Sequence, residues 1–261
     1  MSALAKGIVA VVVVAIVAAA GVWYWNASHT PALPPPPSAS APPPVPAAPA
    51  GPVHPIEGAS EEKLPPLAES DGVIGAALAG LNRDAVAHFL NLQDFVRRVV
   101  ATVDNLPRES YAARLDPVKP MAGLPVTRGE GAALVLAPQN AARYTPFVQA
   151  MDAVDTQKLV AVYRRFYPLF QQAYVDLGYP QGYFNDRLVE VIDHLLDAPE
   201  PAGPVRLTVP HVLYEYADPE LQSLSSGRKV MVRMGLENER RVKAKLREIR
   251  SAVAANPPKP Q

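Results

Sequence analysis

Thr156-Gln-Lys-Leu-Val-Ala-Val-Tyr-Arg-Arg-Phe-Tyr-Pro-Leu-Phe-Gln-Gln-Ala-Tyr-Val-Asp-Leu177 is the stretch that decides the fold. Its apolar residues recur at the spacing of one helical face, which predicts a long amphipathic helix. These residues are Leu159, Val162, Tyr163, Phe166, Phe170, Tyr174 and Leu177. Asp155 stands at the N-cap position, and Gly178 stands at C′, where glycine often ends a helix. Pro168 is expected to kink or divide this helix, because proline lacks the backbone N–H.

Helical patterns also dominate the sequence on both sides of this stretch. Further helices are predicted to begin at Asp71, after the N-cap Ser70, and to cover 92–106, 138–154, 185–197 and 237–253. Two β-prone runs around a glycine-containing turn at 127–131 predict a hairpin, and short strands are expected between 205 and 216. The fold class is therefore mainly α with a small β component, in one domain over 68–253. The tail 254–261 is expected to be disordered.

An uncharged run covers residues 7–25 and matches the ~20 apolar residues that span a bilayer as a helix. Aromatic residues at 23–25 end the run, where such rings favour the membrane interface. A cleaved signal peptide is the alternative, since the alanines at 18–20 fit a cleavage site. The aromatic residues that continue the run favour an uncleaved transmembrane helix. The chain has no cysteine, which excludes a lipoprotein anchor.

Charge predicts the orientation of this transmembrane helix. Lys6 precedes the run, and no Lys or Arg follows it until Lys63. The positive-inside rule places residues 1–6 in the cytoplasm and the remainder across the membrane. We therefore expect a single-pass protein of the bacterial inner membrane, with its C-terminal domain in the periplasm. The lack of cysteine is compatible with that oxidising compartment.

Residues 26–67 are predicted to form a disordered linker, rich in proline and alanine. Proline fixes φ and removes a backbone donor, so neither helix nor sheet propagates through such a segment. A proline-rich chain favours the extended polyproline II conformation and acts as a semi-rigid spacer. The alternative is a docking strip for an aromatic-lined groove. No charged residue flanks the prolines at 34–37 or 42–44 to give such docking specificity.

The sequence contains no strong catalytic, metal or cofactor signature. Glu190 and His194 share a helical face, but they lack the third and fourth ligands of a zinc site, so no metal or cofactor is predicted. Asp186, Glu190 and Asp193 could act as paired carboxylates in acid–base chemistry, as in glycosidases, and this interpretation stays open. Nucleophile-elbow, phosphate-loop and dinucleotide motifs are missing. The net charge of zero gives no reason to expect a nucleic-acid partner.

The segment after the long helix is the best candidate for a binding loop. It is rich in aromatic residues and turn formers, and tyrosine and arginine are enriched at interface hot spots. The candidate binding residues are Tyr179, Tyr183, Asn185, Asp186 and Arg187. The basic helix at 237–253 is interpreted as a solvated face, with binding to an acidic partner or envelope polymer as the alternative.

Four long runs carry a family resemblance. They are Arg97-Arg-Val-Val-Ala-Thr-Val-Asp-Asn-Leu-Pro-Arg108, Tyr163-Arg-Arg-Phe-Tyr-Pro-Leu-Phe170, Tyr179-Pro-Gln-Gly-Tyr-Phe-Asn-Asp-Arg-Leu-Val-Glu-Val-Ile-Asp-His194 and Val212-Leu-Tyr-Glu-Tyr-Ala-Asp-Pro219. Together they resemble a proteobacterial family catalogued as domain of unknown function 3014, over essentially the whole predicted domain. The resemblance implies an N-terminal membrane segment and a proline-rich linker, and it implies no reaction, substrate or catalytic residues.

These observations predict a membrane-anchored protein that presents an interaction or scaffold domain in the cell envelope. Its partners are expected to be the membrane, through residues 7–25, and an envelope protein or polymer. The alternative is a periplasmic glycan hydrolase that uses carboxylates near Asp186 and Glu190. The sequence predicts no oligomeric state.

Overall fold

The structure is a computed structural model, and it describes residues 51–56, 63–110 and 113–254. The predicted transmembrane helix at 7–25 and most of the predicted linker and tail lie outside the described residues. Within the described ranges, no helix is long and apolar enough to span a bilayer. The described chain is mainly helical with four short strands, as the sequence predicts.

The helical elements follow one another closely along the chain. The α-helices are α2 (Asp71–Phe89), α3 (Phe95–Asn105), α4 (Thr145–Asp152), α5 (Thr156–Asp176), α6 (Phe184–Leu196), α7 (Pro219–Gln222), α8 (Ser226–Arg233) and α9 (Leu236–Val253). Short 3₁₀ turns are η1 (Leu67–Glu69), η2 (Ala113–Leu115), η3 (Gly131–Ala133) and η4 (Pro138–Arg143). The predicted helix at 138–154 is thus divided into a 3₁₀ turn and a short α-helix.

Two β-hairpins complete the domain. Strand β1 (Thr127–Arg128) pairs antiparallel with β2 (Val135–Leu136), and β3 (Leu207–Thr208) pairs antiparallel with β4 (Glu215–Tyr216). A bridge between Val135 and Arg206 joins the two hairpins. The first hairpin was predicted, but its first strand begins at Thr127, after the β-prone residues 124–126.

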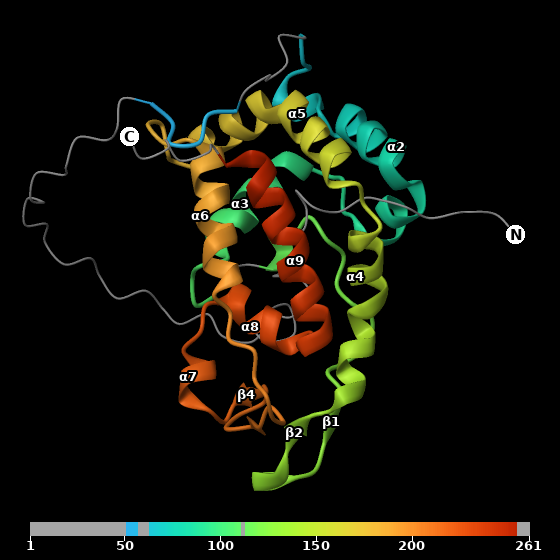
Figure 1. The fold of residues 1–261 in the computed structure, drawn as a ribbon, viewed down its shortest axis with the longest axis vertical. Coiled ribbons are helices and arrows are strands. Elements are labelled where there is room, and N and C mark those ends of the chain that lie inside the picture. Colours follow the sequence, from blue (N-terminus) through green and yellow to red (C-terminus); the bar gives the residue numbers. More distant parts are fainter. Residues whose placement is uncertain (1–50, 57–62, 111–112, 255–261) are drawn as a thin grey trace, which may run out of the picture.

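Helices α3 and α9 lie in the middle of the fold, with α6 and α4 on either side and α5 across one end (Figure 1). Helix α9 packs against α4, α5 and α6, and α3 packs against α5 and α6. The core between them is strongly aromatic. Tyr163, Phe166, Phe170 and Phe184 are all buried, and the rings of Phe170 and Phe184 are stacked at 5.7 Å.

Helix α5 begins and ends where its sequence predicts. The Asp155 side chain accepts a hydrogen bond from Lys158 N at 2.9 Å, as an N-cap residue should. Pro168 lies inside α5 and does not divide it in two, which was one of the two predicted effects of this proline. Ser70 precedes α2 as predicted, but its hydroxyl donates to Leu67 O at 2.8 Å and makes no cap bond.

The domain also includes residues that the sequence assigns to the linker. Leu67 is buried, and Ile56 and Leu64 pack against the core.

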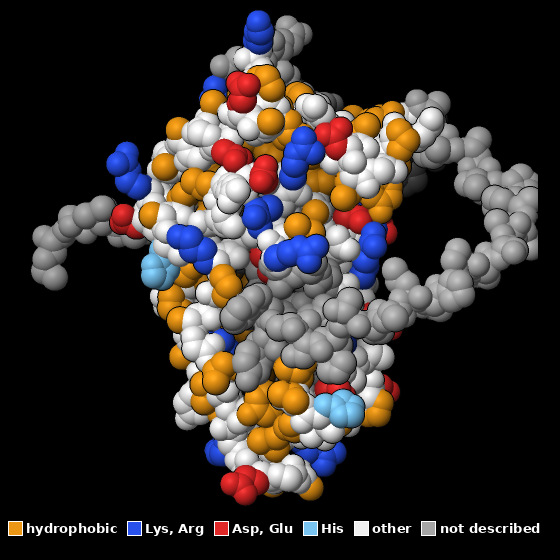
Figure 2. Space-filling model, turned by 180° about the vertical axis from the view of Figure 1, so that it is seen from behind, with side chains coloured by type: hydrophobic (Ala, Val, Ile, Leu, Met, Phe, Trp, Pro, Cys, Tyr) orange, Lys and Arg blue, Asp and Glu red, His pale blue; other side chains and the backbone are white. Residues whose placement is uncertain are grey.

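The basic helix differs from its prediction as well, since Lys243 and Lys245 are buried and several of its arginines pair with acids of other elements. Most of its charge is therefore neutralised within the domain. On the face seen in Figure 2, Lys and Arg side chains gather in the upper half with Asp and Glu side chains among them.

Candidate functional site

The candidate binding loop begins at a well-formed helix end. Gly178 has φ of +118° and follows the C-cap of α5, as predicted. Gly178 N donates to Val175 O at 3.0 Å and Tyr179 N donates to Tyr174 O at 3.3 Å, the two bonds of a Schellman motif. The rings of Tyr174 and Tyr179 stack with their centroids 4.5 Å apart. The loop therefore leaves α5 in one fixed direction.

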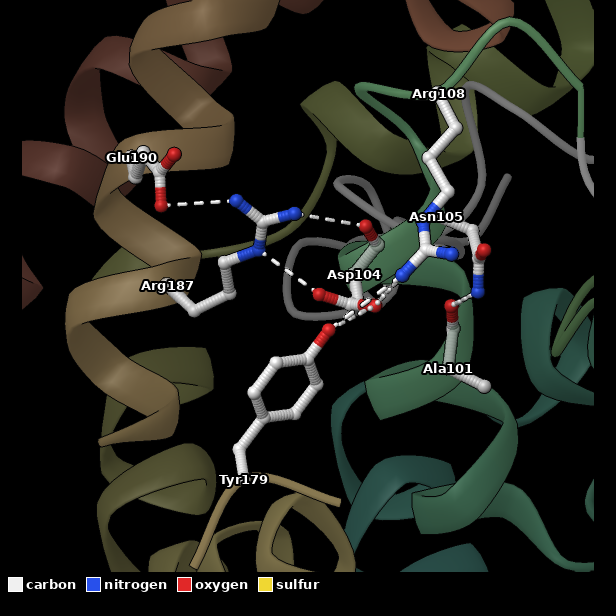
Figure 3. A network of polar contacts seen from close by, with 7 residues as sticks. All are labelled: Ala101, Asp104, Asn105, Arg108, Tyr179, Arg187 and Glu190. Atoms are coloured by element: carbon white, nitrogen blue, oxygen red, sulfur yellow. Dashed lines mark hydrogen bonds and ion pairs between the residues drawn. The ribbon is translucent and has the colours of Figure 1, made fainter. Parts of the chain in front are cut away.

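Tyr179 and Arg187 both point toward Asp104, a buried carboxylate at the end of α3 (Figure 3). Tyr179 OH donates to Asp104 Oδ2 at 3.1 Å, and Arg187 Nε donates to Asp104 Oδ1 at 3.1 Å. Arg108 adds a third contact to Asp104 Oδ2 at 2.7 Å. Arg187 also pairs with Glu190 at 2.9 Å. Two of the five candidate residues are thus held inside the domain by this Asp104 network.

Sequence reasoning missed Asp104 as part of this region. The available signal was its place on α3, four residues after the buried Val100 and therefore on the apolar face. An acid on a buried helical face needs partners, because an unpaired buried charge is very costly. Burial and the neighbouring Asp104 charge raise the pKa of Tyr174 to about 12, so this phenol remains neutral at physiological pH.

Asn185 is fully buried, and its side chain makes three hydrogen bonds. Its Oδ1 accepts from Tyr163 OH at 3.1 Å, and its Nδ2 donates to Val253 O at 2.9 Å. Nδ2 also donates to His54 O at 2.7 Å. Asn185 therefore ties α5 and the end of α9 to the chain that precedes the domain.

Asp186 holds the same preceding chain. Its carboxylate accepts from Val53 N at 2.9 Å and from His54 N at 2.7 Å. We call residues 51–56 the docked segment; it lies beside the loop that leads into α6 (Figure 1). The docked segment lies within the predicted linker at 26–67, so this part of the linker differs from the prediction of disorder. The contacts use backbone atoms of the segment, so its own side chains gave no signal of docking.

Tyr183 is the candidate residue that remains available at the surface, with 36% of its area exposed. It lies on the rim of a shallow depression of about 250 Å³, which also contains Gly51, Gly182, Arg187 and Glu190. We call this hollow the tyrosine depression. Its loop is fixed by Gln171, which donates to Gly182 O at 2.7 Å and accepts from Phe184 N at 2.9 Å. The depression is therefore a largely preformed surface.

The carboxylates considered for catalysis all have partners. Asp186 binds the docked segment, Glu190 pairs with Arg187, and Asp193 pairs with Arg250 at 2.8 Å. His194 Nε2 lies 2.7 Å from Ser225 Oγ, and burial together with the Arg228 charge lowers the pKa of His194. Within the described ranges, no group of three or more His, Asp or Glu side chains is placed to hold a metal ion.

A model for the family described as "Protein of unknown function (DUF3014)" matches residues 95–250. The chain belongs to the DUF3014 family. The match runs from the start of α3 into the last turn of α9, and it includes the Asp104 network, both hairpins and the tyrosine depression except for Gly51. The docked segment precedes the residues that match the DUF3014 model. Neither curated proteins nor solved structures yield a match to this chain.

Proposed function

We propose that this DUF3014 protein is a single-pass inner-membrane protein that presents a periplasmic interaction domain in the cell envelope. Membrane anchoring is supported by the uncharged run at 7–25, which has the length and the aromatic ending of a transmembrane helix. The orientation is supported by Lys6 and by the long stretch without positive charge that follows.

We infer that the domain binds an envelope protein through the tyrosine depression. The observation that carries this inference is the position of the docked segment beside the exposed ring of Tyr183. The chain that comes from the membrane meets the domain at this surface, so the tether fixes where the depression is presented. Tyrosine offers a large contact area and a polar tip at low conformational-entropy cost, which suits an interface anchor.

The charged residues that surround Tyr183 are better suited to hold the loop in place than to catalyse a reaction. Arg187 and Glu190 pair with each other, and the Asp186 carboxylate accepts hydrogen bonds from two backbone amides. A general acid needs a free carboxyl group in a cleft that encloses the substrate. The hollow beside Tyr183 is shallow, and these carboxylates are already bound. The arrangement therefore favours the interaction role over a glycan hydrolase.

In-cell photocrosslinking of the full-length protein tests this proposal. A photoreactive residue replaces Tyr183, and the matched control carries it at the half-buried Tyr214 of the second hairpin. We expect one protein adduct of discrete mass from position 183 and none of that mass from position 214. Adducts with glycan, or identical adducts from both positions, would contradict the proposal.

The partner identified in this way provides a second, quantitative check. Tyr183→Ala should weaken its binding at least tenfold, since a hot-spot side chain contributes about 2 kcal/mol or more. Tyr214→Ala should leave the affinity unchanged. Circular dichroism of the Tyr183→Ala variant should match the unsubstituted protein, because Tyr183 is partly exposed and lies outside the core.

A further inference from the structure

Two neighbouring residues of α6 hold the docked segment through three of its backbone groups. The Asp186 carboxylate accepts from Val53 N at 2.9 Å and from His54 N at 2.7 Å. Asn185 Nδ2 donates to His54 O at 2.7 Å. The Val53 side chain is 60% exposed, and the prolines on either side of this pair are exposed as well. We call Asn185 and Asp186 together the peptide site, because they bind main-chain atoms of another segment.

The shape of the docked segment suits this mode of binding. The chain bends at Val53 and His54, so both amides reach the same carboxylate. Successive backbone N–H groups in a turn form a concave site for an anion, and the Asp186 carboxylate is the anion here. Pro52 and Pro55 flank the pair, and a fixed φ lowers the entropy that the segment loses on docking. The bound chemistry is therefore two free amides between two prolines.

An apolar contact completes the recognition of the docked segment. Ile56 directly follows the second proline and packs against the core of the domain. A segment that fits the peptide site thus reads proline, two residues with free N–H groups, a second proline and a large apolar residue. We call this pattern the P-x-x-P-apolar sequence.

Asn185 is arranged to bind a chain that passes over it. Its Oδ1 accepts from Tyr163 OH at 3.1 Å, and one hydrogen of Nδ2 is donated to Val253 O at 2.9 Å. The amide carries a second N–H, which His54 O satisfies. If the docked segment leaves, this buried donor needs another acceptor. A second chain with the same backbone shape supplies that acceptor.

Tyrosine side chains surround the peptide site. Tyr183 and Asp186 both line the tyrosine depression, and so does Gly51 at the start of the docked segment. Burial raises the pKa of Tyr167, and the neighbouring Asp186 charge raises it further. Surfaces lined by aromatic residues are the usual docking places for proline-rich segments. The peptide site and the tyrosine depression therefore form one continuous surface.

We propose that the peptide site binds a P-x-x-P-apolar segment of the envelope partner, and that the docked segment is its intramolecular competitor. This inference deepens the proposed function and rests on it. A partner that is anchored on Tyr183 presents the rest of its chain at high effective concentration beside Asp186. It can then replace the docked segment by making the same three hydrogen bonds. Partner binding thereby releases residues 51–56 from the domain.

A peptide titration of the full-length protein in detergent tests this competition. The probe is the capped hexapeptide Gly-Pro-Val-His-Pro-Ile, which has the sequence of the docked segment, and saturation-transfer difference NMR detects its binding. The double variant Val53→Pro, His54→Pro lacks both amide donors, so its own segment cannot compete. We expect the probe to bind this variant at least tenfold more tightly than the unsubstituted protein. Equal affinities, or no binding to the double variant, would overturn the proposal.

Matched controls make the titration specific to the two amides and to Asp186. Asp186→Asn, added to the double variant, should lower the affinity for the probe at least tenfold. Asp193→Asn is the control on the same helix and should leave the affinity unchanged, since Asp193 pairs with Arg250 instead. The peptide Gly-Pro-Pro-Pro-Pro-Ile has no N–H at the two central positions and should not bind. Equal binding of the two peptides would overturn the recognition of backbone amides.

Two further measurements identify the source of the bound segment. Light scattering should give the mass of one chain for the unsubstituted protein in its detergent micelle. A dimer that separates in the double variant would assign the peptide site to a second copy and overturn the partner as the source. A protein adduct at position 183 without peptide binding would overturn this inference alone. Peptide binding without any protein adduct would overturn the proposed function, and with it the partner as the source.

Discussion

At the scale of single residues, Asp104 binds Tyr179 and Arg187 on either side of Tyr183. It is 2% exposed and accepts hydrogen bonds from three side chains that come from three segments of the chain. Such a network gains from mutual polarisation in a low-dielectric interior, and it becomes costly when one member is lost. Removal of the Asp104 carboxylate should therefore lower the stability of the domain before it lowers the affinity for a partner.

Asp104→Ala should lower the free energy of unfolding by about 3 kcal/mol, because it removes the buried carboxylate to which Arg187, Tyr179 and Arg108 donate. The measurement is urea denaturation followed by circular dichroism. Asp176→Asn is the matched control: its pair with Arg97 is exposed on both sides, and such pairs contribute about 0–1 kcal/mol. Equal losses of unfolding free energy in the two variants would show that the Asp104 network contributes no more than an exposed ion pair.

Glu239 should make the stability depend on pH. Burial raises the pKa of Glu239 to about 7 from an ordinary value of 4.5, so the folded protein binds more protons than the unfolded chain between these values. Stability from this group is full below about pH 4.5 and is lost as the pH rises through 7. The difference amounts to about 3 kcal/mol at ~1.4 kcal/mol per pKa unit.

Denaturation of the unsubstituted protein and of Glu239→Gln at pH 5 and pH 8 checks this prediction. The stability of the variant should increase relative to that of the unsubstituted protein when the pH rises, because glutamine does not titrate. His194, whose pKa is lowered, loses stability in the opposite direction as the pH falls, but it is present in both proteins. A constant difference between the two proteins would refute the assignment of the pH effect to Glu239.

At the scale of elements, the end of α5 sets the course of the binding loop. Gly178→Ala should cost about 1–2 kcal/mol of stability, because a side chain at φ of +118° is strained. Gly80→Ala is the control: Gly80 lies within α2 with nothing within 4 Å of an added Cβ, and alanine there should stabilise the helix. Thermal unfolding of both variants gives the comparison.

The docked segment can be tested as an element of its own. Asp186→Asn removes the charge that strengthens the bonds from Val53 N and His54 N. We expect the exchange of these two amides to accelerate about tenfold, the equivalent of ~1.4 kcal/mol. Hydrogen–deuterium exchange with mass spectrometry measures this, with Asp193→Asn as the control. Unchanged exchange after Asp186→Asn would show that other contacts hold the segment.

Local signals and long-range contacts explain which features the sequence could predict. The limits of α5 follow from Asp155 and Gly178, which act within a few residues of the helix ends. The Asp104 network joins residues 75 and 83 positions apart, and no local pattern contains such a pairing. The fold class and the exposed Tyr183 were therefore accessible, whereas the buried roles of Asn185 and Arg187 required the packed structure.

At the scale of the whole molecule, the lack of cysteine gives a clean test of the proposed topology. Ser251→Cys places one thiol on the exposed side of α9, and Ser2→Cys places one before the apolar run. A membrane-impermeant maleimide applied to cells with a permeabilised outer membrane should label position 251 and leave position 2 unlabelled until lysis. Labelling of position 2 in intact spheroplasts would contradict the orientation.

The same two variants report whether the N-terminal run is retained. If the run is an uncleaved anchor, Ser2→Cys carries its label on a full-length chain that sediments with membranes after an alkaline wash. A soluble, shortened chain without the label at position 2 would instead support a cleaved signal peptide. Labelling and sedimentation thus separate the two interpretations of residues 7–25.

The docked segment also decides how the domain would respond to a mechanical pull. A force applied to the docked segment reaches Val53 and His54, and the two bonds to Asp186 pass it directly to the first turn of α6. Helix α6 would then bear the load, whereas η1 and α2, which follow the docked segment in the chain, would carry no tension. Rupture of these two bonds would free the docked segment abruptly, so the length of chain that precedes the domain would increase in a step.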